Sequence, residues 1–398
     1  MSLAAEPEKV ALTGNEAVSQ AMRQINPDVV AAYPITPQTE IVQNFSTFVA
    51  DGEVDTHFVR VESEHSAMSA VVGASASGAR SMTATSANGL ALMWEVLYIA
   101  SSTRLPIVMP VVNRALSGPI NIHCDHSDSM GARDSGWIQL YSENAQEAYD
   151  NTIQAIKIAE NFDVQLPVMV CMDGFIISHA LENLEILADD VVTEFIGERE
   201  VEHSLLDVEN PTTFGPLDLQ NWYFEHKRQQ VDGMEKALEI IPQVGREYAE
   251  ISGREYSFFE EYRTSDAEAI LIVIGSTAGT AKDVIDEMRN DGRKVGLLKP
   301  RVFRPLAKEA LLKALDGCKS LAVMDRSDTF STAGGPIYHA VRNVLYDMDN
   351  RPAVGNYIYG LGGRDTKPED IKEVLDEAYE AVQTGQFSRE IRYLGVRE

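Results

Sequence analysis

Short apolar runs that alternate with helix-like segments constrain the fold of this 398-residue chain more than any other feature. Apolar residues recur with helical spacing in the segments 15–25, 40–49, 90–100 and 145–158. Between and after these segments lie short apolar runs at residues 29–33, 57–61, 80–86, 106–113 and 166–174. This alternation is typical of a parallel sheet covered by helices on both faces. The sequence therefore predicts an α/β fold, with a first domain over residues 1–195.

The alternation stops after the first domain and restarts near residue 266. Residues 196–265 are rich in Glu, Asp, Asn and Pro, and the helical spacing there is confined to 234–248. We expect a connector that straps across the surface, with a partly mobile linker as the alternative. A second, smaller α/β domain is predicted over 266–398 from its apolar runs and helical segments, at 269–276, 295–299, 321–325, 280–291, 308–315 and 337–345.

The charge of the chain excludes some classes of partner. A formal net charge of −27 is opposite to what a nucleic-acid binder needs, and it disfavours an anionic membrane surface. No apolar run reaches the length of a membrane span, and residues 1–10 lack the apolar core of a signal peptide. We therefore expect a cytoplasmic protein with neither a nucleic acid nor a membrane as its partner.

The three cysteines, Cys124, Cys171 and Cys318, are far apart in the sequence and form no C-x-x-C pair. This spacing argues against an iron–sulfur cluster or a structural zinc site, and it fits a reducing compartment. The segment His123–His126 invites a metal interpretation, but two histidines in a polar loop do not make a site without supporting groups. We expect no metal ligands in this chain.

Three polar residues each follow a predicted strand. Thr36 lies in a proline-flanked turn, Glu64 begins a helix of small residues over 64–78, and Arg114 follows the run 106–113. In α/β sheets, ligands bind at the carboxyl ends of strands, and an Arg fork suits a carboxylate. These residues predict a site for a small acid. The alternatives are a helix cap for Thr36, a capping carboxylate for Glu64 and a surface salt bridge for Arg114.

Two further motifs are weaker. The segment Gly275–Gly279 suggests a phosphate loop, but it lacks the Lys and the spacing of the known fingerprints. The basic segment Arg301–Pro305 predicts a salt-bridged contact between the domains. The first-domain residues on their own resemble half of an active site.

Five motifs together resemble the alpha subunits of the pyruvate:ferredoxin oxidoreductase family, within the 2-oxoacid:ferredoxin oxidoreductase superfamily. The resemblance spans about residues 10–390 and is carried by Tyr33–Pro37, Glu62–Ala67, Asn113–Ser117, Arg133–Gln139 and Gly360–Asp365. It implies that the first domain is the pyrimidine-side thiamine-binding module. It also implies that residues 266–398 form a domain like the C-terminal domain of transketolase.

The resemblance also implies an activity that needs partners. The family decarboxylates a 2-oxoacid, here pyruvate, on thiamine diphosphate shared with a beta subunit, and passes the acyl group to coenzyme A. Mg²⁺ and [4Fe–4S] clusters belong to partner subunits (beta, gamma and delta), and ferredoxin receives the electrons. Because this chain is strongly acidic, an acidic ferredoxin would dock elsewhere in the assembly.

Roles carry over by motif. Glu64 matches the carboxylate that contacts the aminopyrimidine ring, where a hydrogen-bonded carboxyl group favours the imino tautomer that removes the C2 proton. Thr36 matches a substrate-contacting hydroxyl, and Arg114 matches the partner of the substrate carboxylate. The expected cofactor-binding residues, besides Glu64, are Pro34, Ile35, Asn88 and Gly89.

Alternatives remain for the substrate and the role. The pair Gln38–Thr39 departs from many pyruvate members, so 2-oxoisovalerate or 2-oxoglutarate is the alternative substrate, although the loop 117–128 is more similar to the pyruvate class. A non-catalytic assembly subunit and a self-contained nucleotide-binding α/β enzyme are the other candidates.

Overall fold

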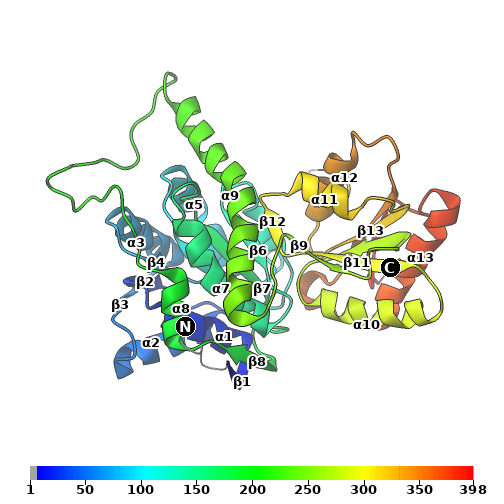
Figure 1. Ribbon diagram of the computed structural model, residues 1–398, viewed down its shortest axis with the longest axis horizontal. Coiled ribbons are helices and arrows are strands. Elements are labelled where there is room, and N and C mark those ends of the chain that lie inside the picture. The colour runs from blue at the N-terminus through cyan, green and yellow to red at the C-terminus, as the bar shows by residue number, and fades with distance from the viewer. Residues whose placement is uncertain (1–6, 331, 398) are drawn as a thin grey trace.

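Two helix-covered sheets lie side by side in the computed structural model, which describes residues 7–330 and 332–397 (Figure 1). We call the seven-stranded sheet with its helices the first lobe and the six-stranded sheet with its helices the second lobe. Within the described residues, a two-stranded sheet of β1 (Glu8–Thr13) and β8 (Leu181–Ile186) completes the set. The observed fold confirms the predicted α/β class.

The first lobe is built on a sheet with the strand order β12-β6-β7-β5-β4-β2-β3, in which only β12 pairs antiparallel among the described strands. Its strands are β2 (Val29–Ala32), β3 (His57–Arg60), β4 (Ser81–Met82), β5 (Val108–Asn113), β6 (Ile138–Tyr141), β7 (Val168–Asp173) and β12 (Val302–Arg304). Its helices are α1 (Gly14–Ile25), α2 (Thr39–Asp51), α3 (Glu64–Ala76), α4 (Ala87–Leu92), α5 (Trp94–Ser102), α6 (Ser127–Gly131), α7 (Ala145–Glu160) and α8 (Asp189–Ile196).

The central strands explain why the sequence pattern works. Every residue of β5 and β7 is buried, because helices cover both faces of the sheet at these strands. At the start of α1, Thr13 accepts a hydrogen bond from the Glu16 N–H, and the Glu16 carboxylate accepts one from the Thr13 N–H. This reciprocal cap fixes where the strand β1 ends and the helix begins.

Two expected elements of the first lobe are shorter than predicted. Only Ser81 and Met82 of the expected strand 80–86 form a strand, although Thr85 still makes an isolated bridge to Val111. The expected helix 90–100 is interrupted at Met93, which separates α4 from α5. The strand therefore ends before the turn that leads into α4, where Ala87 has a φ of 42°.

The second lobe has the strand order β15-β14-β13-β10-β11-β9, with β9 antiparallel to β11 and the other pairs parallel. Its strands are β9 (Phe259–Tyr262), β10 (Ala269–Ile272), β11 (Val295–Pro300), β13 (Ser320–Asp325), β14 (Ala353–Ile358) and β15 (Ile391–Tyr393). Its helices are α10 (Thr277–Asn290), α11 (Lys308–Ala314), α12 (Pro336–Leu345), the 3₁₀ turn η1 (Leu361–Gly363) and α13 (Pro368–Thr384).

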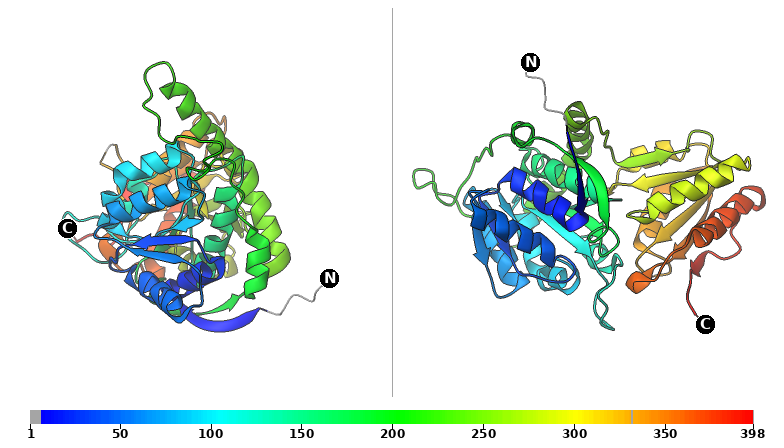
Figure 2. Two further views of the ribbon diagram at one scale, coloured as in Figure 1. Left: turned by 90° about the vertical axis from the view of Figure 1, so that its left-hand side faces the viewer. Right: turned by 90° about the horizontal axis from the view of Figure 1, so that it is seen from below.

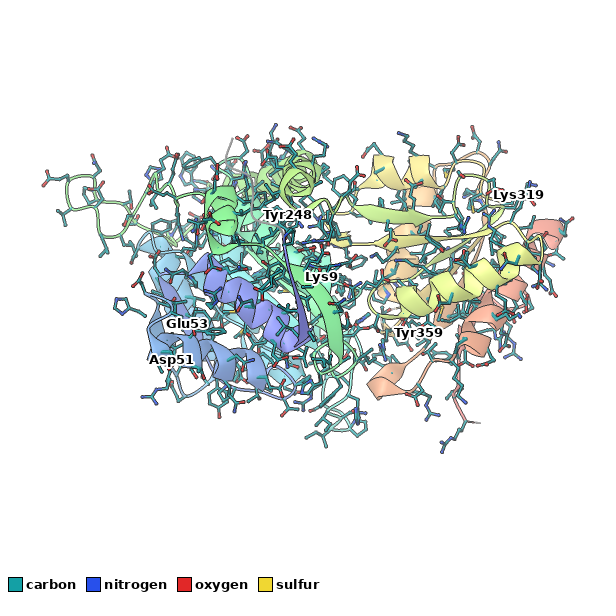
Figure 3. All side chains as sticks on the ribbon, turned by 60° about the horizontal axis from the view of Figure 1, so that its bottom comes forward. Lys9, Asp51, Glu53, Tyr248, Lys319 and Tyr359 are labelled. Atoms are coloured by element: carbon teal, nitrogen blue, oxygen red, sulfur yellow. The ribbon has the colours of Figure 1, made fainter. Side chains whose placement is uncertain are left out.

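The chain between the lobes contains the 30-residue helix α9 (Tyr223–Ser252), which is longer than the predicted segment 234–248. It runs along the first lobe, where the Tyr248 hydroxyl donates to the buried carboxylate of Asp150 on α7 at 2.6 Å (Figure 3). Each sheet contains one strand from the other side of the predicted domain boundary at residue 266. The strand β9 precedes residue 266 and pairs in the second sheet, whereas β12 follows it and pairs in the first.

Three apolar cores hold these layers together. One lies between the first sheet and α1, α7 and α9, and another fills the outer face of the second sheet under α10 and α13. The remaining core is continuous across the boundary, from Met68 and Leu97 in the first lobe to Ile272 and Val341 in the second. Among the residues that the structure describes, none belongs to a helix long and apolar enough to cross a bilayer.

Candidate functional site

The predicted acid-binding residues lie at one edge of the first sheet. The strands β2, β3, β4 and β5 run parallel, so their carboxyl ends meet at the same edge. Thr36 follows β2, Glu64 begins α3 after β3, and Arg114 directly follows β5. The structure places these three residues as the sequence predicts, and it joins them through the start of α4.

Arg114 has one occupied and one available end. Its Nε donates to the carbonyl oxygen of Asn121 at 2.9 Å, and its Nη1 donates to the carbonyl oxygen of Thr36 at 2.8 Å. The residue is only 8% exposed, and its other terminal nitrogen, Nη2, has no partner among the described residues. Since neither partner is a carboxylate, the salt-bridge alternative for Arg114 is wrong, and the guanidinium keeps donors for an anionic ligand.

The turn before α2 presents Thr36 to solvent. Thr36 is exposed, Ile35 is half-buried and Pro34 is exposed. The helix α2 begins at Thr39 after Gln38, so Thr36 does not cap it. The backbone carbonyl of Thr36 is bound to Arg114, which leaves the hydroxyl free to face a ligand.

Glu64 is a buried carboxylate without a partner. It is 7% exposed, and its side chain forms no hydrogen bond or ion pair within residues 7–330 and 332–397. The cap of α3 is instead Ser63, whose Oγ accepts from the Ser66 N–H at 3.3 Å. The capping alternative for Glu64 is therefore wrong. The carboxylate oxygens are not fully buried, so a ligand can reach them and supply a bond.

The start of α4 packs closely against Glu64. A Cβ added at Gly89 would lie 2.5 Å from Thr85 Oγ1 and 2.8 Å from Glu64 Oε1, so only glycine fits there. The preceding residue, Asn88, is exposed, and its amide oxygen accepts from the Ser117 N–H and Oγ at 3.1 and 2.9 Å. Asn88 thus holds the loop after β5 rather than pointing all its polar atoms at a ligand.

More unpartnered polar atoms line the turn into α4. The Oγ1 of Thr85 and the Oγ of Ser86 are buried and have no hydrogen-bond partner. Buried hydroxyls are normally bonded, and each exception calls for an explanation. Together with the Glu64 carboxylate, they fit a planar group that carries both donors and acceptors, such as an aminopyrimidine ring.

Asp128 organises this edge, and the sequence analysis missed it. It is 3% exposed and accepts hydrogen bonds from Ala87 N at 2.9 Å, Asn113 Nδ2 at 2.8 Å, Arg114 N at 3.0 Å and Ser129 N at 2.7 Å. Burial raises the pKa of this carboxyl to about 6, although its hydrogen bonds act in the opposite direction. Its position in the polar segment 123–128 was the only signal in the sequence, and the residue type alone could not reveal its partners.

The two histidines of that segment diverge. The His123 ring packs 5.4 Å from the ring of Phe175, whereas His126 is buried and its Nε2 is 2.7 Å from Asp173 Oδ1. Ligand atoms of Cys124, His126 and Asp173 lie within 4.8 Å of one another, which is a spacing that could hold a metal ion.

The chemistry of this group does not fit a cation. Asp173 also accepts from Arg326 Nη1 at 3.1 Å and from Ser276 N and Oγ at 3.1 and 2.6 Å. Although burial alone would raise the pKa of Asp173, His126 and Arg326 hold it well below its usual range. Burial also raises the pKa of the Cys124 thiol well above its ordinary value, so it would remain protonated. We read this group as a clamp between the lobes.

The structure also shows what the two weaker motifs do. The segment Gly275–Gly279 opens α10, but the Asp173 carboxylate already occupies its N–H donors, where a phosphate would lie. The side chain of Arg301 is buried and bonds the neutral amides of Asn151 and Gln154, at 2.7 and 3.0 Å. Among the described residues, Arg301 thus forms no ion pair, but Arg304 of the same segment does, with its Nη2 3.9 Å from Asp134 Oδ1, so the expected salt-bridged contact is made by Arg304. Burial without a carboxylate partner lowers the pKa of the Arg301 guanidinium to about 10.

Comparisons with known proteins show the family of this chain. The family described as "Pyruvate flavodoxin/ferredoxin oxidoreductase, thiamine diP-bdg" matches residues 20–246, and "Pyruvate:ferredoxin oxidoreductase core domain II" matches residues 267–371. The chain is 59% identical to the pyruvate synthase subunit PorA of Thermotoga maritima, over 98% of this chain and 99% of that protein. It is 42% identical to the ketoisovalerate oxidoreductase subunit VorA of Pyrococcus abyssi, over 98% of each.

Solved structures share the fold. The 2-oxoglutarate:ferredoxin oxidoreductase from Magnetococcus marinus superimposes with a TM-score of 0.76 at 23% identity, over 94% of this chain and 66% of that longer chain. A split-gene transketolase superimposes with a TM-score of 0.57 at 12% identity, over 93% of this chain and 99% of that chain. Both likenesses concern the arrangement of the elements.

Proposed function

Because the chain belongs to the pyruvate:ferredoxin oxidoreductase family as an alpha subunit, we propose that it supplies the pyrimidine-side half of the active site of a pyruvate synthase. The reaction is the oxidative decarboxylation of pyruvate to acetyl-CoA and CO₂, with the electrons passed to ferredoxin. The observation that carries the proposal is Glu64, a largely buried residue at the carboxyl edge of the sheet whose carboxylate has no partner among the described residues.

Glu64 is proposed to bind and orient the coenzyme. Thiamine diphosphate supplies a nucleophilic carbon that attacks the 2-oxo carbon and then stabilises the electrons left after CO₂ departs. The Glu64 carboxyl would bond the ring nitrogen of the aminopyrimidine and hold a proton there, which satisfies the orphaned carboxylate. The unpartnered hydroxyls of Thr85 and Ser86 lie in the turn beside it, and Gly89 lets that turn approach Glu64 closely.

Arg114 is proposed to bind the substrate carboxylate. A carboxylate that enters a buried site needs a cation or several donors, or its desolvation is not compensated. The free Nη2 end of Arg114 offers such donors, while its bonds to Thr36 and Asn121 fix the plane of the guanidinium. Thr36 adds an exposed hydroxyl next to that end.

The rest of the enzyme is proposed to come from partner subunits. The one loop in this chain with a phosphate-like sequence is filled by Asp173, so a beta subunit would hold the diphosphate and its Mg²⁺. The three cysteines are buried and far apart in sequence, so gamma, delta or beta subunits would carry the [4Fe–4S] clusters. Coenzyme A and ferredoxin would bind to those subunits.

Pyruvate is the proposed substrate, and 2-oxoisovalerate is the second candidate. The identity to the pyruvate synthase subunit of Thermotoga maritima is 59%, against 42% for the ketoisovalerate subunit of Pyrococcus abyssi over a similar length. The test is a panel of pyruvate, 2-oxoisovalerate and 2-oxoglutarate on the reconstituted complex, with coenzyme A and a viologen acceptor. Preference for 2-oxoisovalerate would overturn the substrate, and turnover by this chain alone would overturn its role as one subunit.

Arg114→Lys and Arg114→Ala test the substrate contact within that complex. Lysine keeps the charge but loses the planar fork, so it should retain partial activity, whereas alanine should be far worse in both KM for pyruvate and kcat. Thiamine affinity should be nearly unchanged in both variants. Near-normal pyruvate kinetics of Arg114→Ala would show that the carboxylate has another partner.

A further inference from the structure

The glycine-rich segment Gly360–Arg364 of the second lobe has no role in the function proposed above, yet it contacts the loop that carries the substrate arginine. We propose that this segment, through Asn121, is a positioning platform that fixes the guanidinium of Arg114 for the 2-oxoacid carboxylate. The inference rests on the proposed role of Arg114. It assigns to the second lobe a part in substrate recognition.

Asn121 joins the two lobes in a single residue. Its backbone carbonyl accepts the hydrogen bond from Arg114 Nε at 2.9 Å, and its side-chain Nδ2 donates to the Gly362 carbonyl at 3.0 Å. Its Oδ1 also accepts from the His123 N–H at 2.7 Å. The oxygen that orients Arg114 is therefore held in place by a bond from the second lobe.

A second contact fastens the same loop. The Gly362 N–H donates to Asp125 Oδ2 at 3.1 Å, and Asp125 Oδ1 accepts from the Ser127 N–H at 3.0 Å. Ser127 Oγ in turn accepts from the Leu116 N–H at 2.9 Å. Seen from below in Figure 2, the loop after β5 extends between the two lobes. Two points of the loop, Asn121 and Asp125, are thus tied to one turn of the second lobe.

The shape of that turn requires glycine. Gly362 and Gly363 have φ angles of +60° and +79°, in the left-handed region that side chains disfavour. A Cβ at Gly362 would lie 2.5 Å from Asn121 Nδ2, and a Cβ at Gly363 would lie 2.3 Å from the His123 Cβ. The turn and the loop approach each other too closely for any other residue, so a small change in the turn must move the loop.

The platform itself is anchored. The His126 N–H donates to the Arg326 carbonyl at 2.8 Å, and the Arg326 guanidinium bonds Asp173 of the first lobe. Arg326 Nε also donates to the Gly360 carbonyl at 3.4 Å. The turn cannot drift without disturbing these buried bonds, which is the rigidity that a positioning element needs.

A matched pair of glycine substitutions tests the platform in the reconstituted complex. Gly363→Ala adds a Cβ against His123, whereas Gly317→Ala has nearly the same φ (+78°) in the same lobe and nothing within 4 Å. Both introduce a similar backbone strain, so Gly317→Ala shows how much of any fall in the thermal midpoint comes from strain alone. Only Gly363→Ala should raise KM for pyruvate, by about tenfold, and lower kcat, with thiamine affinity unchanged.

A double-mutant cycle separates positioning from general support. Asn121→Ala keeps the backbone oxygen but releases it from Gly362, and it does not depend on whether the glycine variants assemble. If Asn121 acts through Arg114, the loss of kcat/KM in Asn121→Ala combined with Arg114→Lys should fall well short of the product of the single losses. A purely structural role predicts that the losses multiply.

The outcomes distinguish this inference from the proposed function. If Arg114→Ala itself leaves pyruvate kinetics near normal, the proposed substrate contact fails and the platform fails with it. If Arg114→Ala is impaired while Gly363→Ala matches Gly317→Ala, or while the cycle is multiplicative, the platform alone is overturned. A raised KM confined to Gly363→Ala, with a non-multiplicative cycle, supports it.

Discussion

The two lobes have equivalent positions at the edges of their sheets, but one holds an unpartnered carboxylate and the other a fully bonded one. In each, a helix begins beyond the carboxyl end of parallel strands, where ligands usually bind in α/β sheets. In the first lobe, Glu64 at the start of α3 is buried with no partner among the described residues. In the second lobe, the start of α10 is filled by Asp173, which accepts bonds from Ser276, His126 and Arg326.

This difference shows that position in the fold does not decide function. A carboxylate that lacks its partner indicates a site that a ligand completes. A carboxylate whose bonds are all made within the chain indicates a joint between two parts of the protein. Under the two proposals above, the lobes divide the work, with binding in the first and positioning in the second.

The largest effect is expected on stability, when the Asp173 carboxylate at the start of α10 is removed. Asp173→Ala removes the carboxylate that pairs with the buried Arg326, and breaking a buried pair costs about 3–5 kcal/mol of unfolding free energy. Urea unfolding of the full chain measures this loss, and the exposed Asp316→Ala is the control. A loss no greater than that of Asp316→Ala would mean that Asp173 is not the joint.

At Glu64, we expect a loss of turnover rate rather than of stability. Glu64→Gln removes the proton-holding carboxyl and should slow turnover of the complex by about a hundredfold, or about 2.7 kcal/mol. The fold should not be destabilised, because the Glu64 side chain makes no hydrogen bond or ion pair among the described residues. Pyruvate turnover and hydrogen–deuterium exchange at thiamine C2 measure the effect, with the exposed Glu62→Gln as control. Wild-type exchange in Glu64→Gln would contradict the proposed role.

Asp128 tests the comparison through the pH dependence of stability. Its carboxylate is bonded within the chain, like that of Asp173, but its pKa is raised. Its folded pKa of about 6 lies above the unfolded value of about 3.9, so the stability from its protonation is complete below pH 3.9 and disappears as the pH rises through 6. Over that window its contribution should fall by about 2 kcal/mol. Unfolding free energies at pH 4.5 and 6.5 should show a smaller difference in Asp128→Asn. If the difference between the two pH values were unchanged in Asp128→Asn, the raised pKa would not belong to Asp128.

The smallest effect should come from trimming one bond of the joint. Ser276→Ala removes the 2.6 Å bond from Ser276 Oγ to Asp173 but leaves the Ser276 N–H and Arg326 in place. The expected cost is about 1 kcal/mol of unfolding free energy. The exposed Ser388→Ala should change nothing measurable by the same method. A loss as large as that of Asp173→Ala would mean that Ser276, rather than Arg326, carries the joint.

The sequence predicted the candidate site around Glu64 better than the joint around Asp173. Apolar runs such as 106–113 located the strands, and parallel strands bring Thr36, Glu64 and Arg114 to one edge whatever the details of packing. The joint depends on single bonds between residues far apart in the chain, such as those of Asp173 to Ser276 and Arg326. No local pattern of residue types encodes such bonds.

The second lobe shows the same limit. The amphipathic spacing of α13 was present in the sequence, with Ile371, Val374, Leu375 and Ala378 buried, but the strands β14 and β15 beside it gave no comparable run. Asn121 and Asp128 were unremarkable polar residues in a polar loop. Their importance follows from backbone groups that only the folded chain brings within reach.

The strand β12 has a consequence for how the protein is made. It pairs with the edge strand β6 of the first sheet, although it lies after β10 and β11 of the second. β6 leaves the ribosome long before β12. One edge of β6 therefore stays unpaired until β10 and β11 of the second lobe have also been synthesised. Unpaired edges invite association with other chains. The order of synthesis thus makes the nascent chain most vulnerable just before residue 304 appears.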